Sequence, residues 1–92
     1  MNARVLLQKY MQNSEKVFAR IKLRPDAQVQ GQDKVAEVID HAKRYLSDAK
    51  YYGEKQQYET GLIAIAYCEG MLDTLRLLGL VEFTWQEAKE SA

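Results

Sequence analysis

The sequence predicts an all-α protein, an antiparallel three-helix bundle with a short C-terminal helical tail. Apolar residues recur at helical spacing in three segments, residues 3–23, 33–52 and 55–78. The link between the second and third segments is short, so those two helices must lie side by side and antiparallel. A chain of 92 residues suits one domain, so we assign residues 1–92 to a single bundle whose tail is residues 80–92.

Composition places the chain among globular proteins and gives no sign of a membrane. It is 47% apolar and 28% charged with zero net charge, which is outside the disordered range. The N-terminus lacks the pattern of a signal peptide, and no uncharged run approaches the roughly 20 residues that span a bilayer. The single Cys68 cannot form an internal disulfide. We therefore expect a soluble, cytoplasmic protein without membrane association.

The first predicted helix has one apolar stripe and one basic stripe. Pro25 should end it, because proline lacks an N–H and disfavours helical backbone in the residue before it. The basic stripe consists of Lys9, Lys16 and Arg20. The apolar stripe consists of Leu6, Leu7, Tyr10, Met11, Val17, Phe18 and Ile21.

The second predicted helix begins near Asp33 and buries one apolar face. Gly53 is expected to supply the positive φ that often ends a helix. His41, the one histidine of the chain, lies at the edge of the apolar face. That face consists of Val35, Val38, Ile39, Ala42, Tyr45, Leu46, Ala49 and Tyr52.

The third predicted helix is apolar around more than half of its circumference and needs cover on more than one side. Leu62 and Ala66, opposite its main apolar face, are apolar too. Gly61 and Gly70 each cost about 1 kcal/mol against alanine in a helix, so we expect a neighbouring helix to approach closely at both. The main face consists of Ile63, Ala64, Tyr67, Cys68, Met71, Leu72, Leu75 and Leu78.

Gly79 should end the third helix, with Leu80 making the apolar contact that follows such a cap. Thr84 and Glu87 have the spacing of a capping box, which predicts a short terminal helix from Trp85. Phe83 and Trp85 are expected to fold back onto the bundle.

Glu69, Asp73 and Arg76 share one stripe of the third helix and form a candidate surface. Two carboxylates one turn apart can bind a metal or share a proton. The alternative, which we favour, is a solvated edge with a weak ion pair between Asp73 and Arg76. One histidine cannot build a histidine metal cluster, and Cys68 lies on the apolar arc with no visible base, so we expect no catalytic residue, no metal and no cofactor.

The basic face of Lys9, Lys16 and Arg20 could meet phosphates or an acidic protein. Zero net charge weighs against binding of nucleic acid, and cations near a helix C-terminus are also stabilised by the helix dipole.

Four tyrosines are interpreted as lining the seam between the second and third helices. They are Tyr45, Tyr52, Tyr58 and Tyr67.

The segment "YLSDAKYYGEKQQYETGLIAIAYCEGMLDTLRLLG" resembles the archaeal domain of unknown function 357 family. The resemblance is carried by Asp48-Ala49, Tyr52, Tyr58, Ala64, Tyr67, Glu69-Gly70, Leu72-Asp73 and Gly79. It implies a three-helix bundle, an archaeal cytoplasmic origin and no established activity. Relatives appended to nucleotidyltransferase-like enzymes imply an accessory or assembly role.

These observations favour a non-enzymatic protein-interaction module that forms a homodimer. Its candidate interface is Leu62, Ala66, Phe83 and Trp85, because the third helix has more apolar surface than two neighbours can cover. In the competing account, the tail folds over Leu62 and Ala66 within one chain. Two other classes stay open: a nucleic-acid-associated protein using the basic face, and a metal-dependent enzyme using Glu69 and Asp73.

Overall fold

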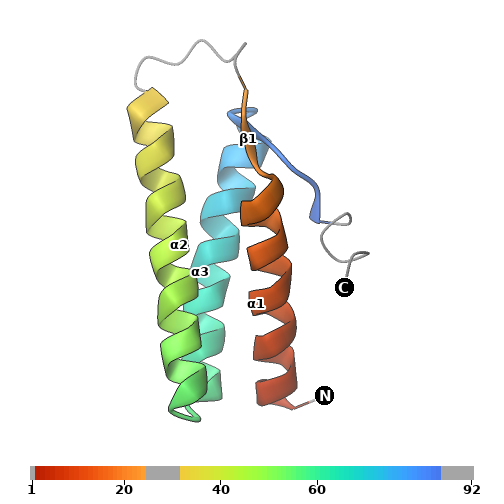
Figure 1. The fold of residues 1–92 in the computed structure, drawn as a ribbon, viewed down its shortest axis with the longest axis vertical. Helices are drawn as coiled ribbons and strands as arrows, with labels where there is room; N and C mark the ends of the chain where they lie inside the picture. Colours follow the sequence, from red (N-terminus) through yellow and green to blue (C-terminus); the bar gives the residue numbers. More distant parts are fainter. Residues whose placement is uncertain (1, 25–31, 86–92) are drawn as a thin grey trace.

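The computed structural model describes residues 2–24 and 32–85 (Figure 1). It confirms the predicted three-helix bundle. Helices α1 (Ala3–Arg20) and α2 (Gln32–Glu54) run in opposite directions, and α3 (Tyr58–Leu77) lies behind them, parallel to α1 and antiparallel to α2 (Figure 1). In the described residues, no helix is both long and apolar enough to cross a membrane. The elements are α1 (Ala3–Arg20), β1 (Lys22–Leu23), α2 (Gln32–Glu54), α3 (Tyr58–Leu77) and β2 (Val81–Glu82).

Helix α1 is shorter than the sequence predicts. It begins after Asn2, whose side-chain Oδ1 accepts a hydrogen bond of 2.9 Å from the Val5 N–H. It ends at Arg20, because Ile21 is extended (φ −62°, ψ 136°) and Lys22–Leu23 form strand β1. The prediction that the helix reaches residue 23 is therefore wrong.

A two-stranded antiparallel sheet ties the ends of α1 and α3 together. Lys22 lies opposite Glu82 and Leu23 opposite Val81, and the Arg24 N–H donates to the Leu80 carbonyl over 3.1 Å. These bonds join residues nearly sixty positions apart in the chain. Helical periodicity reports local structure, so it could not reveal them.

The two predicted glycine turns have opposite outcomes. Gly53 is not a cap: α2 runs on through Glu54, and Gln56 takes the positive φ of 62° instead. Gly79 is confirmed, with φ of 74°. Its N–H donates to Arg76, and the Leu80 N–H donates to Leu75, each over 3.0 Å, which is the Schellman pattern.

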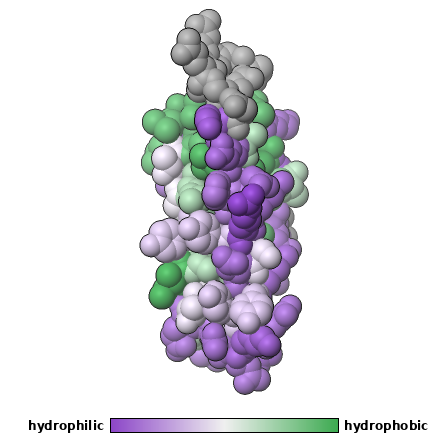
Figure 2. All heavy atoms as spheres, turned by 90° about the vertical axis from the view of Figure 1, so that its left-hand side faces the viewer, coloured by the Kyte–Doolittle hydropathy of each residue, from purple (hydrophilic) through white to green (hydrophobic). Residues whose placement is uncertain are grey.

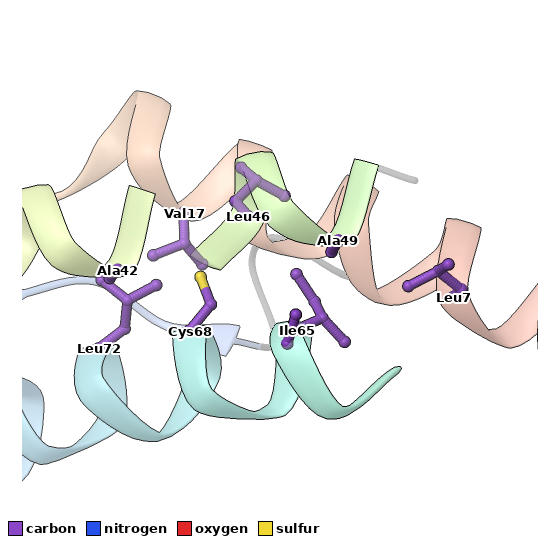
Figure 3. Packing of buried hydrophobic residues seen from close by; sticks show 9 residues of the cluster. Leu7, Val17, Ala42, Leu46, Ala49, Ile65, Cys68 and Leu72 are labelled. Carbon is purple, nitrogen blue, oxygen red and sulfur yellow. The ribbon is translucent and has the colours of Figure 1, made fainter. Parts of the chain in front are cut away.

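The core lies where the three helices meet (Figure 3). Cys68 is buried there, as predicted, and burial raises the pKa of its thiol to about 11. The main buried cluster consists of Leu7, Val17, Ala42, Leu46, Ala49, Ala64, Ile65, Cys68 and Leu72. A second cluster, formed by Val35, Leu75 and Val81, anchors β2 at the end of the bundle.

The rotation of α3 differs from the prediction, since Ile65 is buried and Ile63 is exposed. Gly61 explains this rotation. A Cβ at Gly61 would lie 2.7 Å from Leu7 Cδ2 and 3.4 Å from the Ala49 carbonyl oxygen, so the glycine lets α3 approach both neighbours. Close approach is thus confirmed at Gly61. It is wrong at Gly70, where nothing lies within 4 Å of an added Cβ.

Two polar side chains are buried on α1, and the sequence pattern did not indicate them. Asn13 and Ser14 are as buried as their apolar neighbours. Asn13 Nδ2 and Ser14 Oγ make no hydrogen bond of ordinary geometry in the described structure. Unpaired buried polar atoms weaken a core, so both residues reduce the stability of this small bundle.

Candidate functional site

A wide apolar groove follows the outer face of α3 beside the first half of α2. Its volume is about 800 Å³. Among the described residues that line it, Lys34 alone is charged. The lining residues are Lys34, Val35, Val38, Ile63, Ala66, Tyr67, Gly70, Met71, Thr74, Leu75, Leu78 and Leu80.

Large apolar side chains stand out along this groove and at its end. Ile63 is 62% exposed, Tyr67 57%, Leu77 71% and Leu78 67%. They are exposed because the core uses the opposite face of α3, through Gly61, Ala64, Cys68 and their neighbours. Figure 2 views the molecule from the α2 side and shows hydrophobic residues flanking a hydrophilic strip, mostly in its upper half.

Small residues form the centre of the groove. Ala66, Gly70 and Thr74 follow at four-residue spacing and line it together. Thr74 Oγ1 donates a hydrogen bond of 2.8 Å to the Gly70 carbonyl, so its hydroxyl is satisfied within the helix. A surface with small residues in the centre and large apolar residues at the sides fits the backbone of another helix.

The aromatic edge of the groove is fixed by a stacked pair. The rings of Tyr45 on α2 and Tyr67 on α3 lie 5.3 Å apart with an angle of 19° between their planes. This contact confirms that Tyr45 and Tyr67 line the seam between α2 and α3. It also holds the exposed Tyr67 ring in a defined place beside Gly70.

The acidic edge of α3 holds Trp85, the last described residue of the tail. Asp73 Oδ1 accepts hydrogen bonds from Arg76 Nε at 3.0 Å and Arg76 Nη2 at 2.8 Å, which confirms their predicted ion pair. The same oxygen accepts a third bond of 3.0 Å from Trp85 Nε1, which the sequence did not indicate. The Trp85 and Arg76 hydrogen bonds hold the pKa of Asp73 below its ordinary value.

Glu69, Asp73 and Arg76 do lie together along this edge, and Glu69 is half-buried. No group of three or more metal-ligating side chains occurs in the part of the chain that the structure describes. His41 is exposed on α2, outside this edge and outside the groove. Within this edge, the Asp73 carboxylate is engaged by Arg76 and Trp85.

A protein-family model matches most of the chain. The family described as Protein of unknown function (DUF357) matches residues 9–81. The chain belongs to the DUF357 family. The match includes α1 from Lys9 onward, all of α2 and α3, the groove and Asp73, whereas Trp85 lies beyond it. No curated protein and no solved structure matches the chain.

The candidate interface of this DUF357 chain is divided between two surfaces. Ala66 is exposed and lines the groove. Leu62, Phe83 and Trp85 are half-buried against the chain's own core, and Phe83 packs edge-on against Trp85 at 5.1 Å. Whether these three residues also contact a partner stays a prediction.

The structure separates the three residues of the predicted basic face. Lys9 is exposed and Lys16 half-buried along α1, but Arg20 joins a different group at the end of the bundle. There Arg20, Lys22, Arg24 and Arg76 line a cleft of about 450 Å³. Arg24 lies 3.9 Å from Glu82, which also lines the cleft. The β1–β2 pairing creates this cleft, so α1 periodicity could not have indicated it.

Proposed function

We propose that this DUF357 protein is a non-enzymatic interaction module that binds an apolar helix in the α3 groove. The observation that carries the proposal is the apolar strip of Ile63, Tyr67, Leu77 and Leu78, exposed on a single small domain. Monomeric proteins rarely expose contiguous apolar surface of this kind, and larger patches mark interaction sites. In recognition of this type, the groove contacts one apolar face of the bound helix, whose residues recur at three- and four-residue spacing.

The chemistry-bearing residues support a non-catalytic role. Cys68 is buried with its pKa raised, so its reactive thiolate form is disfavoured. Asp73 is engaged by Arg76 and Trp85. An assembly role, as an accessory to a larger enzyme, is part of this proposal, and we place the protein in the cytoplasm, where a free thiol is stable.

Oligomeric state tests the groove directly. We expect the full chain to self-associate at micromolar concentration in light scattering, and Ile63→Arg to abolish association without lowering helix content. Val5→Arg is the matched control, since Val5 is also an exposed apolar residue but lies on α1, outside the groove. If both variants behave as the wild type, and amide signals of α3 do not change with concentration or with an added peptide of residues 58–78, the groove has no binding role.

The basic cleft favours a second candidate function, binding of nucleic acid. The cations of this cleft come from α1, from β1 and the residue after it, and from α3, beside Thr84 and Phe83, a combination that suits phosphate and base contacts. Two of them also have acidic neighbours, since Arg24 lies 3.9 Å from Glu82 and Arg76 binds Asp73. We expect binding of generic RNA or duplex DNA to weaken steeply with salt and to weaken in Lys22→Ala. The variants Lys9→Ala and Lys16→Ala separate this cleft from the α1 face. Binding that none of these changes affects would reject both basic surfaces.

A further inference from the structure

We infer that the helix bound in the groove is α3 of a second copy, paired antiparallel about a two-fold axis that passes between Tyr67 and Gly70. This inference rests on the proposed function and names its partner. In a two-fold interface the same patch meets itself, so each large residue must find a small one at the symmetric position. The strip of α3 has this property.

The register follows from the positions of large and small residues. An axis between Tyr67 and Gly70 places Tyr67 opposite the partner's Gly70, and Ile63 opposite the partner's Thr74. Gly70 offers open space, since nothing lies within 4 Å of an added Cβ, and Tyr67 is held beside it by Tyr45. The exposed tyrosine of each copy thus fills the notch of the other, and Ala66 lies near the axis where the backbones approach most closely.

Charge selects the antiparallel direction. Lys34, whose Nζ also lies 3.4 Å from Glu37 Oε2 on the surface of α2, lines the groove together with Thr74 and Leu78 of the C-terminal half of α3. The exposed Glu59 lies in the first turn of α3, on the same stripe as Ile63 and Ala66. Antiparallel pairing brings each Lys34 to the partner's Glu59. Parallel pairing would instead bring lysine to lysine and glutamate to glutamate, which repel.

Two further properties favour a second copy over an unrelated helix. The chain has zero net charge, so two copies meet without long-range repulsion. The groove follows α3 from Ile63 to Leu78, and antiparallel α3 helices that overlap over this length cover each other's exposed strip.

Cysteine cross-linking tests the register. We expect the double variant Ile63→Cys/Thr74→Cys to form a reducible covalent dimer under mild oxidation, because a disulfide needs Cα atoms within about 7 Å. Each single variant should stay uncross-linked, since eleven residues of helix separate the two positions by roughly 16 Å. Native Cys68 can remain, because it is fully buried.

The outcomes distinguish this inference from the proposed function. If the single variant Ile63→Cys forms a cross-linked dimer, the antiparallel arrangement is overturned. If the chain is dimeric but neither the double variant nor a single variant cross-links, the α3 interface is overturned. A chain that remains monomeric would also overturn the inference. In that last case, binding of another apolar helix, lost in Ile63→Arg, would still support the groove.

Charge reversal gives an independent test. We expect Lys34→Glu or Glu59→Lys to weaken dimerisation about tenfold, and the double exchange to restore it. Lys9→Glu is the control, because Lys9 is exposed on α1 outside the groove. Equal effects of Lys34→Glu and Lys9→Glu, or no recovery in the double exchange, would contradict the proposed pairing of Lys34 with Glu59.

Discussion

Trp85 Nε1 donates a hydrogen bond of 3.0 Å to Asp73 Oδ1, the same oxygen that accepts from Arg76. This contact joins the chain after β2 to the C-terminal half of α3. Trp85 and Phe83 then cover part of the core, which α1 and α2 leave open. This hydrogen bond therefore connects the acidic edge of α3 to the packing of the tail.

Removing the donor of this bond should loosen the tail. We expect Trp85→Phe to lower the free energy of unfolding by about 0.5–1.5 kcal/mol, because it removes the hydrogen bond but keeps the aromatic contact with Phe83. Urea denaturation followed by circular dichroism measures the change. An unchanged midpoint would mean that the bond to Asp73 adds nothing to stability.

Acid should release the hydrogen bond between Trp85 and Asp73. The pKa of Asp73 is held below its ordinary value of 3.8 by the bonds from Trp85 and Arg76. Its contribution is therefore fully present above pH 3.8 and is lost as the pH falls through the lower folded pKa. Fluorescence of Trp85, the one tryptophan, should report this step. Asp73→Asn should lack it, and an identical acid transition in that variant would exclude Asp73 as the cause.

The sequence was sufficient for the three helices and for most of their buried faces, because these depend on local periodicity. It failed where distant segments decide. Strand β1 exists because Leu23 pairs with Val81, and α1 accordingly ends early. The rotation of α3 about its own axis depends on the fit of Gly61 against Leu7. The sequence of α3 does not specify this rotation, because the helix is apolar on both sides.

The two glycines of α3 should respond in opposite directions to alanine. Gly61→Ala places a methyl group 2.7 Å from Leu7 Cδ2, in a core where Leu7 is fully buried, so we expect a loss of about 1–3 kcal/mol. Gly70→Ala meets open space and should stabilise the monomer by about 1 kcal/mol through helix propensity. Thermal melts at low protein concentration compare them. The same Gly70→Ala should weaken dimerisation, because its methyl group occupies the notch for Tyr67.

The loss of stability on truncating a core side chain should increase with the burial of that side chain. Leu72 is fully buried, so Leu72→Ala should cost about 2–5 kcal/mol. Val38 is half-buried beside the groove, so Val38→Ala should cost less, about 1 kcal/mol. Chemical denaturation of both variants gives the two losses. A larger loss for Val38→Ala would mean that dimerisation buries Val38.

The groove could be predicted only in part. The sequence showed the excess of apolar surface on α3. The four-residue spacing of Ala66, Gly70 and Thr74 is also present in the sequence, but it was not interpreted as a stripe of small residues. The placement of Phe83 and Trp85 was open between two accounts, because a tail can cover its own core or a partner's. The hydrogen bond of Trp85 to Asp73 joins residues on different elements, and no sequence pattern indicates it.

The buried pair of Ser14 and Cys68 yields the last prediction. Burial raises the pKa of the Cys68 thiol to about 11, and the nearby Ser14 hydroxyl opposes that rise without making a well-formed hydrogen bond. Ser14→Ala should therefore raise the pKa of Cys68 further. It should also stabilise the fold by up to about 1 kcal/mol, since it removes an unpaired buried hydroxyl. Cys68 should react with a thiol reagent at pH 8 only as fast as the chain opens, and more slowly in Ser14→Ala. Fast labelling of the native wild type, with the helices intact, would show that Cys68 is reached without unfolding and would contradict its place in the core.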